Sequence, residues 1–321
     1  MKICIIYGVS NKKGMVKIGM DIRSLRYFLV AAEEKNITRA AEKLFIAQPP
    51  LSRQIKLLEE ELGVKLFIRG KRHLLLTEEG LYLKQQAEEI LYLMAKTESH
   101  LGRMGNAEYG TVSVAATATG CMCVLPDLIE GFHAVHPHIR FQVWTGDGDE
   151  IQERLEKNLA DIGITRDTIR TENYDCVFLR NDPWAVVCGR GSPIAKKRGG
   201  AELSDLQKEA LIIPMRQSLQ NEINSWLNGV AADRNIFCYY NAVSAVLNLA
   251  ERNLGVIVCP ESMKNIIDRE KLCCKKIVPE QHSDIYIEKK RYKVMNTAVE
   301  LFWNYALSSV SKAKPKPKPA E

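Results

Sequence analysis

The chain has 321 residues, too many for one ordinary hydrophobic core, so we expect two or more domains. Its 46% hydrophobic and 26% charged residues are typical of a folded globular protein. The net charge of +6 is unevenly spread: residues 20–76 hold eleven Lys and Arg against seven Asp and Glu, whereas residues 77–310 are net acidic. This asymmetry predicts a nucleic-acid-binding face on the N-terminal part alone.

The sequence gives no sign of a membrane or an export route. No stretch is long and apolar enough to span a bilayer, and the first residues lack the cleavage site of a signal peptide. We therefore expect a cytoplasmic protein. The nine cysteines include no C-x-x-C pair. The apolar neighbours of Cys188 and Cys259 favour buried reduced thiols, with redox sensing through Cys121 and Cys123 as the alternative.

The sequence motifs of the common enzyme classes are also missing. There is no G-x-S-x-G, Walker or dinucleotide fingerprint, and the six histidines have no nucleophile or acid partner at motif spacing. We therefore predict a protein that is not an enzyme, with no catalytic residues, no cofactor and no metal site.

Three short helices are predicted near the N-terminus. The first carries an apolar stripe at the spacing of a buried helix face, formed by Leu25, Phe28, Leu29 and Ala32. A break at residues 35–36 precedes the second helix, for which we predict Thr38 as the N-cap. The link at residues 45–47 has the three-residue length that a helix-turn-helix uses.

The third predicted helix combines an apolar face with a polar edge. Its apolar face is formed by Leu51, Ile55, Leu58 and Leu62. Pro49 and Pro50 fit its first turn, where N–H groups have no intrahelical partner. An amide, a hydroxyl and two cations lie along the other side of its start, at Gln48, Ser52, Arg53 and Lys56. Because Gln pairs with adenine and Arg with guanine in the major groove, this edge predicts base recognition, with a solvated helix face as the alternative.

A strand, a basic turn and a second strand follow, at residues 66–68, 69–73 and 74–76. Gly70 suits the turn, and the cations Arg69, Lys71 and Arg72 lie around it. A narrow A·T minor groove attracts arginine, so the pattern predicts the DNA-binding wing of a winged helix-turn-helix.

Residues 20–80 resemble the DNA-binding domain of LysR-type transcriptional regulators. The shared pattern comprises Leu25, Phe28, Thr38, Ala40, Ala41, Leu44, Gln48, Pro49, Leu51, Ser52, Ile55, Leu58, Glu59, Leu62, Gly63, Leu66, Phe67, Arg69 and residues 76–80. Ala47 departs from it, because the family often has a capping Ser or Thr there, worth about 1 kcal/mol. The resemblance implies a phosphate contact at Thr38 and further DNA contacts at Gln48, Pro49, Ser52, Arg53 and Arg72.

A long helix is predicted from residue 78 to about 104. One heptad position is occupied by Gly80, Ala87, Met94 and Leu101. A second is occupied by Leu83, Ile90, Thr97 and Met104. This flawed stripe favours helix pairing, and a helix packed in the core of one chain is the alternative. The resemblance implies a linker helix that dimerises, and hence a homodimer or homotetramer.

Strands and helices alternate after residue 110, which predicts parallel α/β sheets. The expected strands are residues 111–116, 140–144, 161–164, 177–179, 184–188, 211–214 and 256–260. Helices are expected near 125–136, 150–159, 221–230 and 242–252. This order resembles the effector-binding domain of the same regulators. It implies two α/β subdomains, joined by crossing strands, that resemble the type 2 fold of periplasmic binding proteins.

The resemblance implies that a small-molecule effector binds between these subdomains. The implied contacts are Thr117, Ala118, Thr119, Gly146, Arg216, Gln217, Ser218, Asn241 and Ser244. Arg216 is the cation best suited to hold a carboxylate in a bidentate pair, so we expect an organic acid or an amino acid. The alternatives are turn and cap roles for Thr117 and Thr119, and a surface ion pair for Arg216.

We therefore expect a DNA-binding transcription regulator whose partners are promoter DNA, the effector and RNA polymerase, with no membrane. Its five expected segments are an extension outside the fold at 1–19, the winged helix-turn-helix at 20–77, the linker helix at 78–106, the effector domain at 107–308 and a disordered basic tail at 309–321. A solute-binding protein is the rival prediction, but it requires an export signal and no DNA-binding headpiece.

Overall fold

The computed structural model describes residues 20–69, 74–101, 109–166, 172–227, 235–291 and 295–312. The chain divides into two compact units, Met1–Gly102 and Arg103–Glu321. The expected extension at 1–19 and most of the expected tail lie outside the described residues.

The N-terminal unit packs three helices, a hairpin and one long helix around a single apolar core. Its elements are α1 (Ile22–Glu34), α2 (Ile37–Lys43), α3 (Gln48–Leu62), β1 (Phe67–Arg69), β2 (Leu74–Leu76) and α4 (Glu78–Leu101). The largest fully buried side chains here are Phe28, Leu25, Leu51, Leu58 and Leu66. The expected winged helix-turn-helix is therefore present, with β1 and β2 antiparallel.

Two local expectations about these helices are wrong. Asn36, and not Thr38, is the N-cap of α2, and its side-chain oxygen accepts hydrogen bonds from the N–H groups of Thr38 (2.8 Å) and Arg39 (3.2 Å). Thr38 lies inside the helix, where its own N–H needs a partner. Leu62 is 38% exposed, because α3 ends at Gly63 in the left-handed conformation and the buried face stops one turn earlier, at Leu58.

The start of α3 explains why a capping side chain is dispensable there. Ala47 is the N-cap and makes no side-chain hydrogen bond. A capping oxygen accepts from the second or third N–H of a helix, but those positions are Pro49 and Pro50, which have none. The expected loss of about 1 kcal/mol at Ala47 is therefore wrong, because a Ser or Thr in its place would find no donor.

The heptad stripe of helix α4 is buried in its first half and more exposed in its second. A Cβ atom at Gly80 would collide with the carbonyl oxygen of Leu66, so glycine allows the first turn of α4 to pack against the residues before β1. This close approach explains the break in the heptad stripe. Leu83 and Ala87 are buried within the unit, whereas Ile90 and Leu101 are 37% and 61% exposed. Only the first half of α4 is therefore part of the core of this unit.

The C-terminal unit contains a first α/β subdomain. Its strands β3 (Gly110–Ala116), β4 (Ile139–Thr145) and β5 (Ile162–Thr165) are parallel, with β3 in the middle. Its helices are α5 (Ala118–Cys123), α6 (Leu125–His133), α7 (Gly148–Glu156) and α12 (Thr297–Lys312). Phe132 of α6 and Phe302 of α12 meet edge to face in its core, with ring centroids 5.2 Å apart.

A second subdomain repeats the parallel arrangement. Strand β8 (Leu211–Pro214) lies between β10 (Val256–Pro260) and β9 (Ile236–Tyr240), parallel to both. Its remaining elements are α8 (Pro193–Lys196), β7 (Ala201–Glu202), α9 (Leu203–Leu206), α10 (Gln217–Trp226), η1 (Val243–Ala245), α11 (Leu247–Glu251), η2 (Glu261–Asn265) and β11 (Leu272–Val278).

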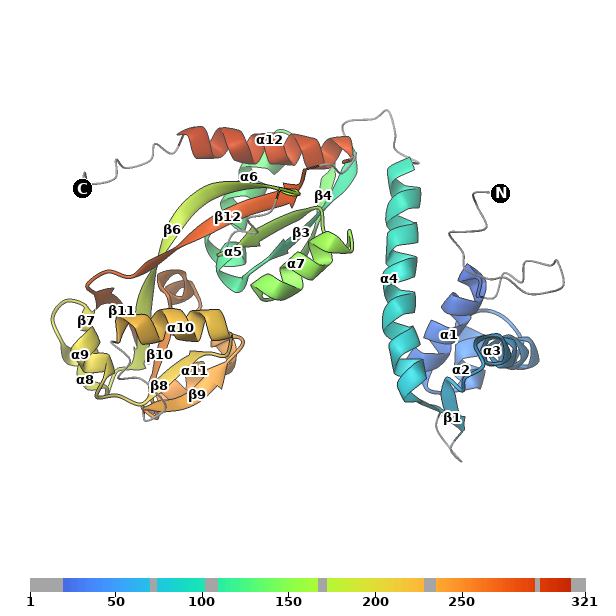
Figure 1. Ribbon diagram of the computed structural model, residues 1–321, viewed down its shortest axis with the longest axis horizontal. Helices are drawn as coiled ribbons and strands as arrows, with labels where there is room; N and C mark the ends of the chain where they lie inside the picture. The colour runs from blue at the N-terminus through green and yellow to red at the C-terminus, as the bar shows by residue number, and fades with distance from the viewer. Residues whose placement is uncertain are drawn as a thin grey trace. The chain divides into compact units, whose positions relative to one another are not determined.

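Two antiparallel strands connect the subdomains. β6 (Tyr174–Gly189) and β12 (His282–Lys290) run side by side between the two groups of elements, as Figure 1 shows. β12 continues the sheet to β5, and β6 continues it to β10. The expected crossing strands and the expected fold class, a winged helix-turn-helix followed by two α/β subdomains, are confirmed.

The structure adds details that the sequence pattern did not predict. Residues 177–179 and 184–188, expected as separate strands, are parts of the single 16-residue strand β6. Strand β12 was not predicted individually. Helix α12 runs to Lys312, past the expected start of the tail at 309, and it buries Phe302 and Ala306 against the first subdomain.

The N-caps of α2 and α3 offer a matched pair of substitutions. Ala47→Ser should leave the stability of the start of α3 unchanged within about 0.3 kcal/mol, whereas Asn36→Ala should cost about 1 kcal/mol at α2, because only Asn36 accepts helix N–H groups. Hydrogen exchange of the α2 and α3 peptides measures both. Increased protection of α3 in Ala47→Ser would contradict the explanation.

Candidate functional site

The polar edge of α3 lines a hollow of about 870 Å³. The residues around it are Gln48, Pro49, Ser52, Arg53, Lys56, Glu59, Lys65 and Phe67. The structure therefore brings together five of the residues predicted to contact DNA. Gln48, Pro49, Arg53 and Lys56 are exposed and Ser52 is half-buried, so their polar atoms are accessible to a ligand.

Side chains of both charges line the hollow, and its lysines are exposed to solvent. Lys56 pairs with Glu60 at 3.4 Å across one helical turn, and both side chains are more than half exposed. Such an exposed pair is weak and screened by salt, so it leaves Lys56 able to exchange partners. Lys65, which the sequence analysis missed, adds a cation that is 71% exposed. Its position directly between α3 and the first wing strand was the signal available in the sequence.

Glu59 connects α3 to the first wing strand, β1. Its Oε1 accepts hydrogen bonds from the N–H groups of Leu66 (2.9 Å) and Phe67 (3.2 Å), and its Oε2 lies 3.0 Å from Lys65 Nζ. The residue is 7% exposed. A buried carboxylate with two amide donors and an ammonium group fixes the direction in which the chain leaves α3 and enters β1. Glu59 was noted only as part of the family pattern.

The other residues predicted to contact DNA belong to α2 and to the wing segment, and two of them lie outside the described residues. Thr38 is exposed on the first turn of α2, and it does not line the hollow. Arg69 is the last residue of β1, while Lys71 and Arg72 lie outside the described residues, as does the turn that they were predicted to form.

The effector residues of the first subdomain lie where β3 ends. Thr117 is the N-cap of α5, and its hydroxyl accepts from Gly120 N–H (3.2 Å) and lies 3.0 Å from the Thr119 hydroxyl. Ala118, the first residue of α5, is exposed. The N–H of Gly146, after β4, donates to the carbonyl oxygen of Ala116 (3.3 Å), so this loop lies beside the start of α5. Thr117 therefore has the capping role that was the alternative to effector contact.

The second subdomain contributes two adjacent loops. Arg216 is the N-cap of α10, which Gln217 and Ser218 begin, and both of these residues are exposed. The N–H of Met215 donates to the carbonyl oxygen of Tyr240 at 2.7 Å, so the loop that contains Asn241 lies against it. Asn241 and Ser244 are exposed.

Arg216 also bridges the two subdomains. Its Nη2 lies 3.0 Å from Oδ1 of Asp149 in the first turn of α7. Gly148 permits this approach, because a Cβ atom there would lie 2.7 Å from the guanidinium. The surface ion pair weighed as the alternative for Arg216 is thus present. Its partner comes from the opposite subdomain, so Arg216 holds the carboxylate of Asp149 between the two subdomains.

Within the described parts of the chain, no three His, Cys, Asp or Glu side chains are grouped so that they could hold a metal ion. Among the same residues no helix has the length and apolarity needed to cross a membrane.

The carboxylate of Glu59 makes the N-terminal unit sensitive to acid. Burial raises the pKa of Glu59, but the N–H groups of Leu66 and Phe67 and the Lys65 ammonium together hold it below its ordinary value. This stabilisation is present above the pKa of the unfolded chain, near pH 4.5, and is lost as pH falls through the lower folded value. Glu59→Gln should therefore flatten the fall in stability between pH 5 and pH 3.

Hydrogen exchange of the β1 peptide across this pH range measures the effect, with Glu60→Gln, an exposed neighbour, as the control. Parallel profiles for Glu59→Gln and the unmodified protein would show that the carboxylate does not hold the strand.

Two family models match the chain. A bacterial regulatory helix-turn-helix model of the LysR family matches residues 22–81, and a LysR substrate-binding domain model matches residues 105–311. Between them they leave residues 82–104 unmatched, so most of α4 lies outside both models.

Individual relatives show the same architecture. The regulator BsdA of Bacillus subtilis is 30% identical over 256 residues, 76% of this chain and 85% of BsdA. The structure of full-length CbnR in complex with its target DNA has a TM-score of 0.76 and 25% identity, covering 90% of this chain and all of CbnR. A structure of CbnR alone, at 24% identity and a TM-score of 0.77, supports the fold. The chain belongs to the LysR family of DNA-binding transcriptional regulators, which are not enzymes and which carry an effector-binding domain.

Proposed function

We propose that this regulator recognises a specific promoter sequence through the α3 edge and responds to a small organic acid or amino acid bound between the subdomains of its effector domain. In this proposal residues 20–77 bind DNA, 78–106 link and dimerise, and 107–308 sense the effector. The single observation that carries it is the convergence of Gln48, Ser52 and Arg53 on one hollow beside the wing strand.

The chemistry of the α3 edge supports base recognition. A helix whose buried face is fixed by Leu51 and Leu58 can present its first turn to the major groove in only one orientation. There the Gln48 amide and the Arg53 guanidinium have the donor patterns that adenine and guanine edges accept. Lys56 and Lys65 supply phosphate-binding charge beside them. CbnR, whose complex with target DNA has the same architecture, supports the assignment.

The wing and α2 supply the remaining proposed DNA contacts. Arg69, Lys71 and Arg72 would place charge in the adjacent minor groove, and Thr38, exposed on α2, would contact a phosphate. Contact with RNA polymerase follows from a regulator bound at a promoter and is proposed on that ground alone.

The second half of α4 supports a dimer or a tetramer. Met94 is half-buried and Leu101 is 61% exposed, although both belong to the heptad stripe that is buried at Ala87. A partner helix covering this half would remove their apolar surface from water. Two copies of α3 would then meet half-sites about one helical turn, ~34 Å, apart on DNA.

The effector class rests on Arg216. An arginine already paired with a carboxylate, that of Asp149, has the geometry to pair with the carboxylate of a ligand. The hydroxyls of Thr117 and Thr119, 3.0 Å apart, would add neutral donors from the first subdomain. The exposed side chains of Gln217, Ser218, Asn241 and Ser244 would complete the site with Ala118 and Gly146.

Selection of bound sequences from random DNA tests the DNA-binding half of the proposal. The unmodified protein should select an interrupted inverted repeat. Arg53→Ala should relax the preference at one base pair per half-site, with a loss of about 1–3 kcal/mol in discrimination between bases. Lys56→Ala should instead weaken binding to all sequences equally. Uniform weakening by Arg53→Ala would show that Arg53 contacts only phosphate.

Substitution on either side of the ion pair tests the effector half. Small organic acids are first screened for a rise in unfolding temperature, and the best is titrated by calorimetry. Arg216→Ala should abolish its binding, whereas Asp149→Asn should keep or strengthen it, because a competing carboxylate is removed. Undiminished acid binding by Arg216→Ala would exclude Arg216 from the site.

A further inference from the structure

Two cysteines of the second subdomain face each other across neighbouring strands. β11 runs antiparallel to β6, and Cys273 lies directly opposite Cys188 in this register. Their sulfur atoms are 3.4 Å apart. Directly opposed residues of antiparallel strands have Cα atoms about 4.5–5.5 Å apart, within the range that a disulfide spans. The backbone therefore needs no rearrangement for the two sulfurs to bond.

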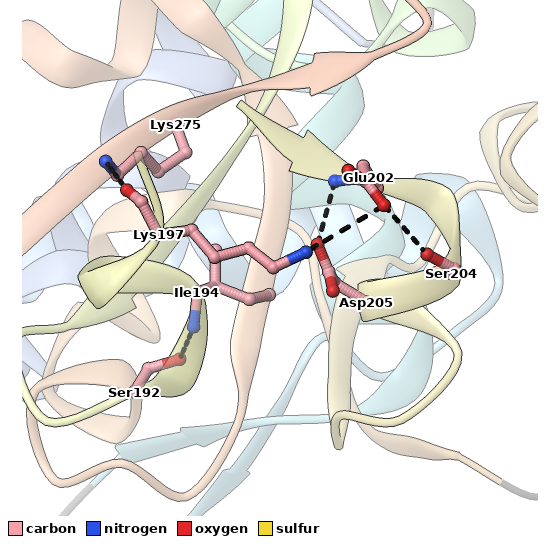
Figure 2. A network of polar contacts seen from close by, with 7 residues as sticks. All are labelled: Ser192, Ile194, Lys197, Glu202, Ser204, Asp205 and Lys275. Atoms are coloured by element: carbon pink, nitrogen blue, oxygen red, sulfur yellow. Dashed lines mark hydrogen bonds and ion pairs between the residues drawn. The ribbon is translucent and has the colours of Figure 1, made fainter. Parts of the chain in front are cut away.

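The register that opposes the two thiols is held from both sides. Leu272 pairs with Gly189 and Lys276 with Ala185, so the ladder continues in both directions. Beside it, the Lys275 ammonium donates to the carbonyl oxygen of Lys197 (3.0 Å), and Lys197 pairs with Asp205 (2.7 Å), as Figure 2 shows. These contacts tie β11 to the residues that follow α8 and to α9. The two sulfurs consequently stay close together in the folded subdomain.

The strand geometry also makes the pair specific. Successive side chains of a strand point to opposite faces of the sheet. Cys188 and Cys273 both pack in the cluster around Trp184 and Leu211, whereas Cys274 packs in the cluster on the other face and lies opposite Val187. Cys274 is thus adjacent in sequence but is directed away from Cys188.

The two thiols differ in access. Cys188 is fully buried, and burial, reinforced by the neighbouring Cys273, raises its pKa to about 12. It is therefore protonated at neutral pH and shielded from reagents. Cys273 is half-buried and is the thiol that an oxidant reaches first. An accessible thiol with a protected thiol in contact is the arrangement of an attacking and a resolving cysteine.

We infer that Cys188 and Cys273 form an oxidisable pair that closes to a disulfide when low-molecular-weight disulfides accumulate. The Cys273 thiolate attacks a sulfur of the small disulfide, forming a mixed disulfide and releasing one thiolate. Cys188 then loses its proton and attacks the Cys273 sulfur, releasing the second small thiol. Two protein thiols are oxidised by two electrons, one small disulfide is reduced to two thiols, and the two protons leave with them.

The bond would act on the strands that join the subdomains. β6 continues from Cys188 through Trp184 to Tyr174 in the first subdomain, and β11 leads after Val278 into β12. The new link would close a loop containing most of the second subdomain, which restricts its unfolded chain. Oxidation should therefore raise the unfolding temperature of the effector domain, by about 5 °C.

The test uses the full-length protein, reduced first and then incubated with millimolar glutathione disulfide. Peptide mass spectrometry after blocking the remaining thiols should find a Cys188–Cys273 cross-link that dithiothreitol reverses. Cys274→Ser should retain the cross-link. Cys188→Ala should instead accumulate glutathione on Cys273, because the resolving thiol is absent.

Cys273→Ser, at a half-buried position, keeps the test decisive if Cys188→Ala does not fold. It should lose both the cross-link and the rise in unfolding temperature. The inference is overturned if the unmodified protein keeps both thiols free, if it stops at glutathione on Cys273, or if the cross-link joins other cysteines such as Cys121 and Cys123.

Discussion

The one-sided burial of α3 is the constraint on which the DNA-binding unit depends. Leu51, Ile55 and Leu58 are at most 4% exposed, and they fix the rotation of the helix about its own axis. At the intervening positions Arg53, Gln54 and Lys56 are thereby exposed, and Ser52 is half-buried. The hydrophobic effect, which has no sequence specificity of its own, thus determines which polar groups are available to DNA.

Glu59 extends this constraint from the helix to the wing. Residue 59 follows the last fully buried leucine of α3, and its carboxylate binds the two amide groups at the start of β1. Gly80 then allows α4 to pack against the same stretch of backbone. Helix α3, strand β1 and helix α4 are therefore joined at one point, around Leu66. A shift of one of these elements would therefore change its contacts with the other two.

Much of this was predictable from the sequence, because periodicity and turn chemistry act locally. The apolar spacing in α1 and α3 and the strand–turn–strand pattern of the wing predicted elements that the structure contains. The N-cap of α2 was missed because Thr38 and Asn36 are both good caps, and only the backbone conformation decides between them. Leu62 continued the periodic pattern, yet the helix ends beside it, and periodicity carries no information about what lies opposite.

The contacts that could not be predicted are those between distant residues. The Arg216–Asp149 ion pair joins positions 67 residues apart, and the Cys188–Cys273 contact joins positions 85 apart. The sequence pattern singled out Arg216 and Cys188, but it did not indicate their partners. Strand β12 was missed for a related reason, since its burial depends on pairing with β5 and β6 from earlier in the chain. The resemblance to a family predicted the architecture, whereas these pairings are visible only in the folded structure.

We propose that the exposed start of α3 distinguishes one base sequence from another. The most direct measurement compares the affinity of the purified protein for its selected duplex and for random duplex of the same length, at physiological salt. We expect the selected duplex to bind at least about 10³-fold more tightly, which is the lower end for sequence-specific regulators. Equal affinities would contradict it, because charge alone would then account for the binding.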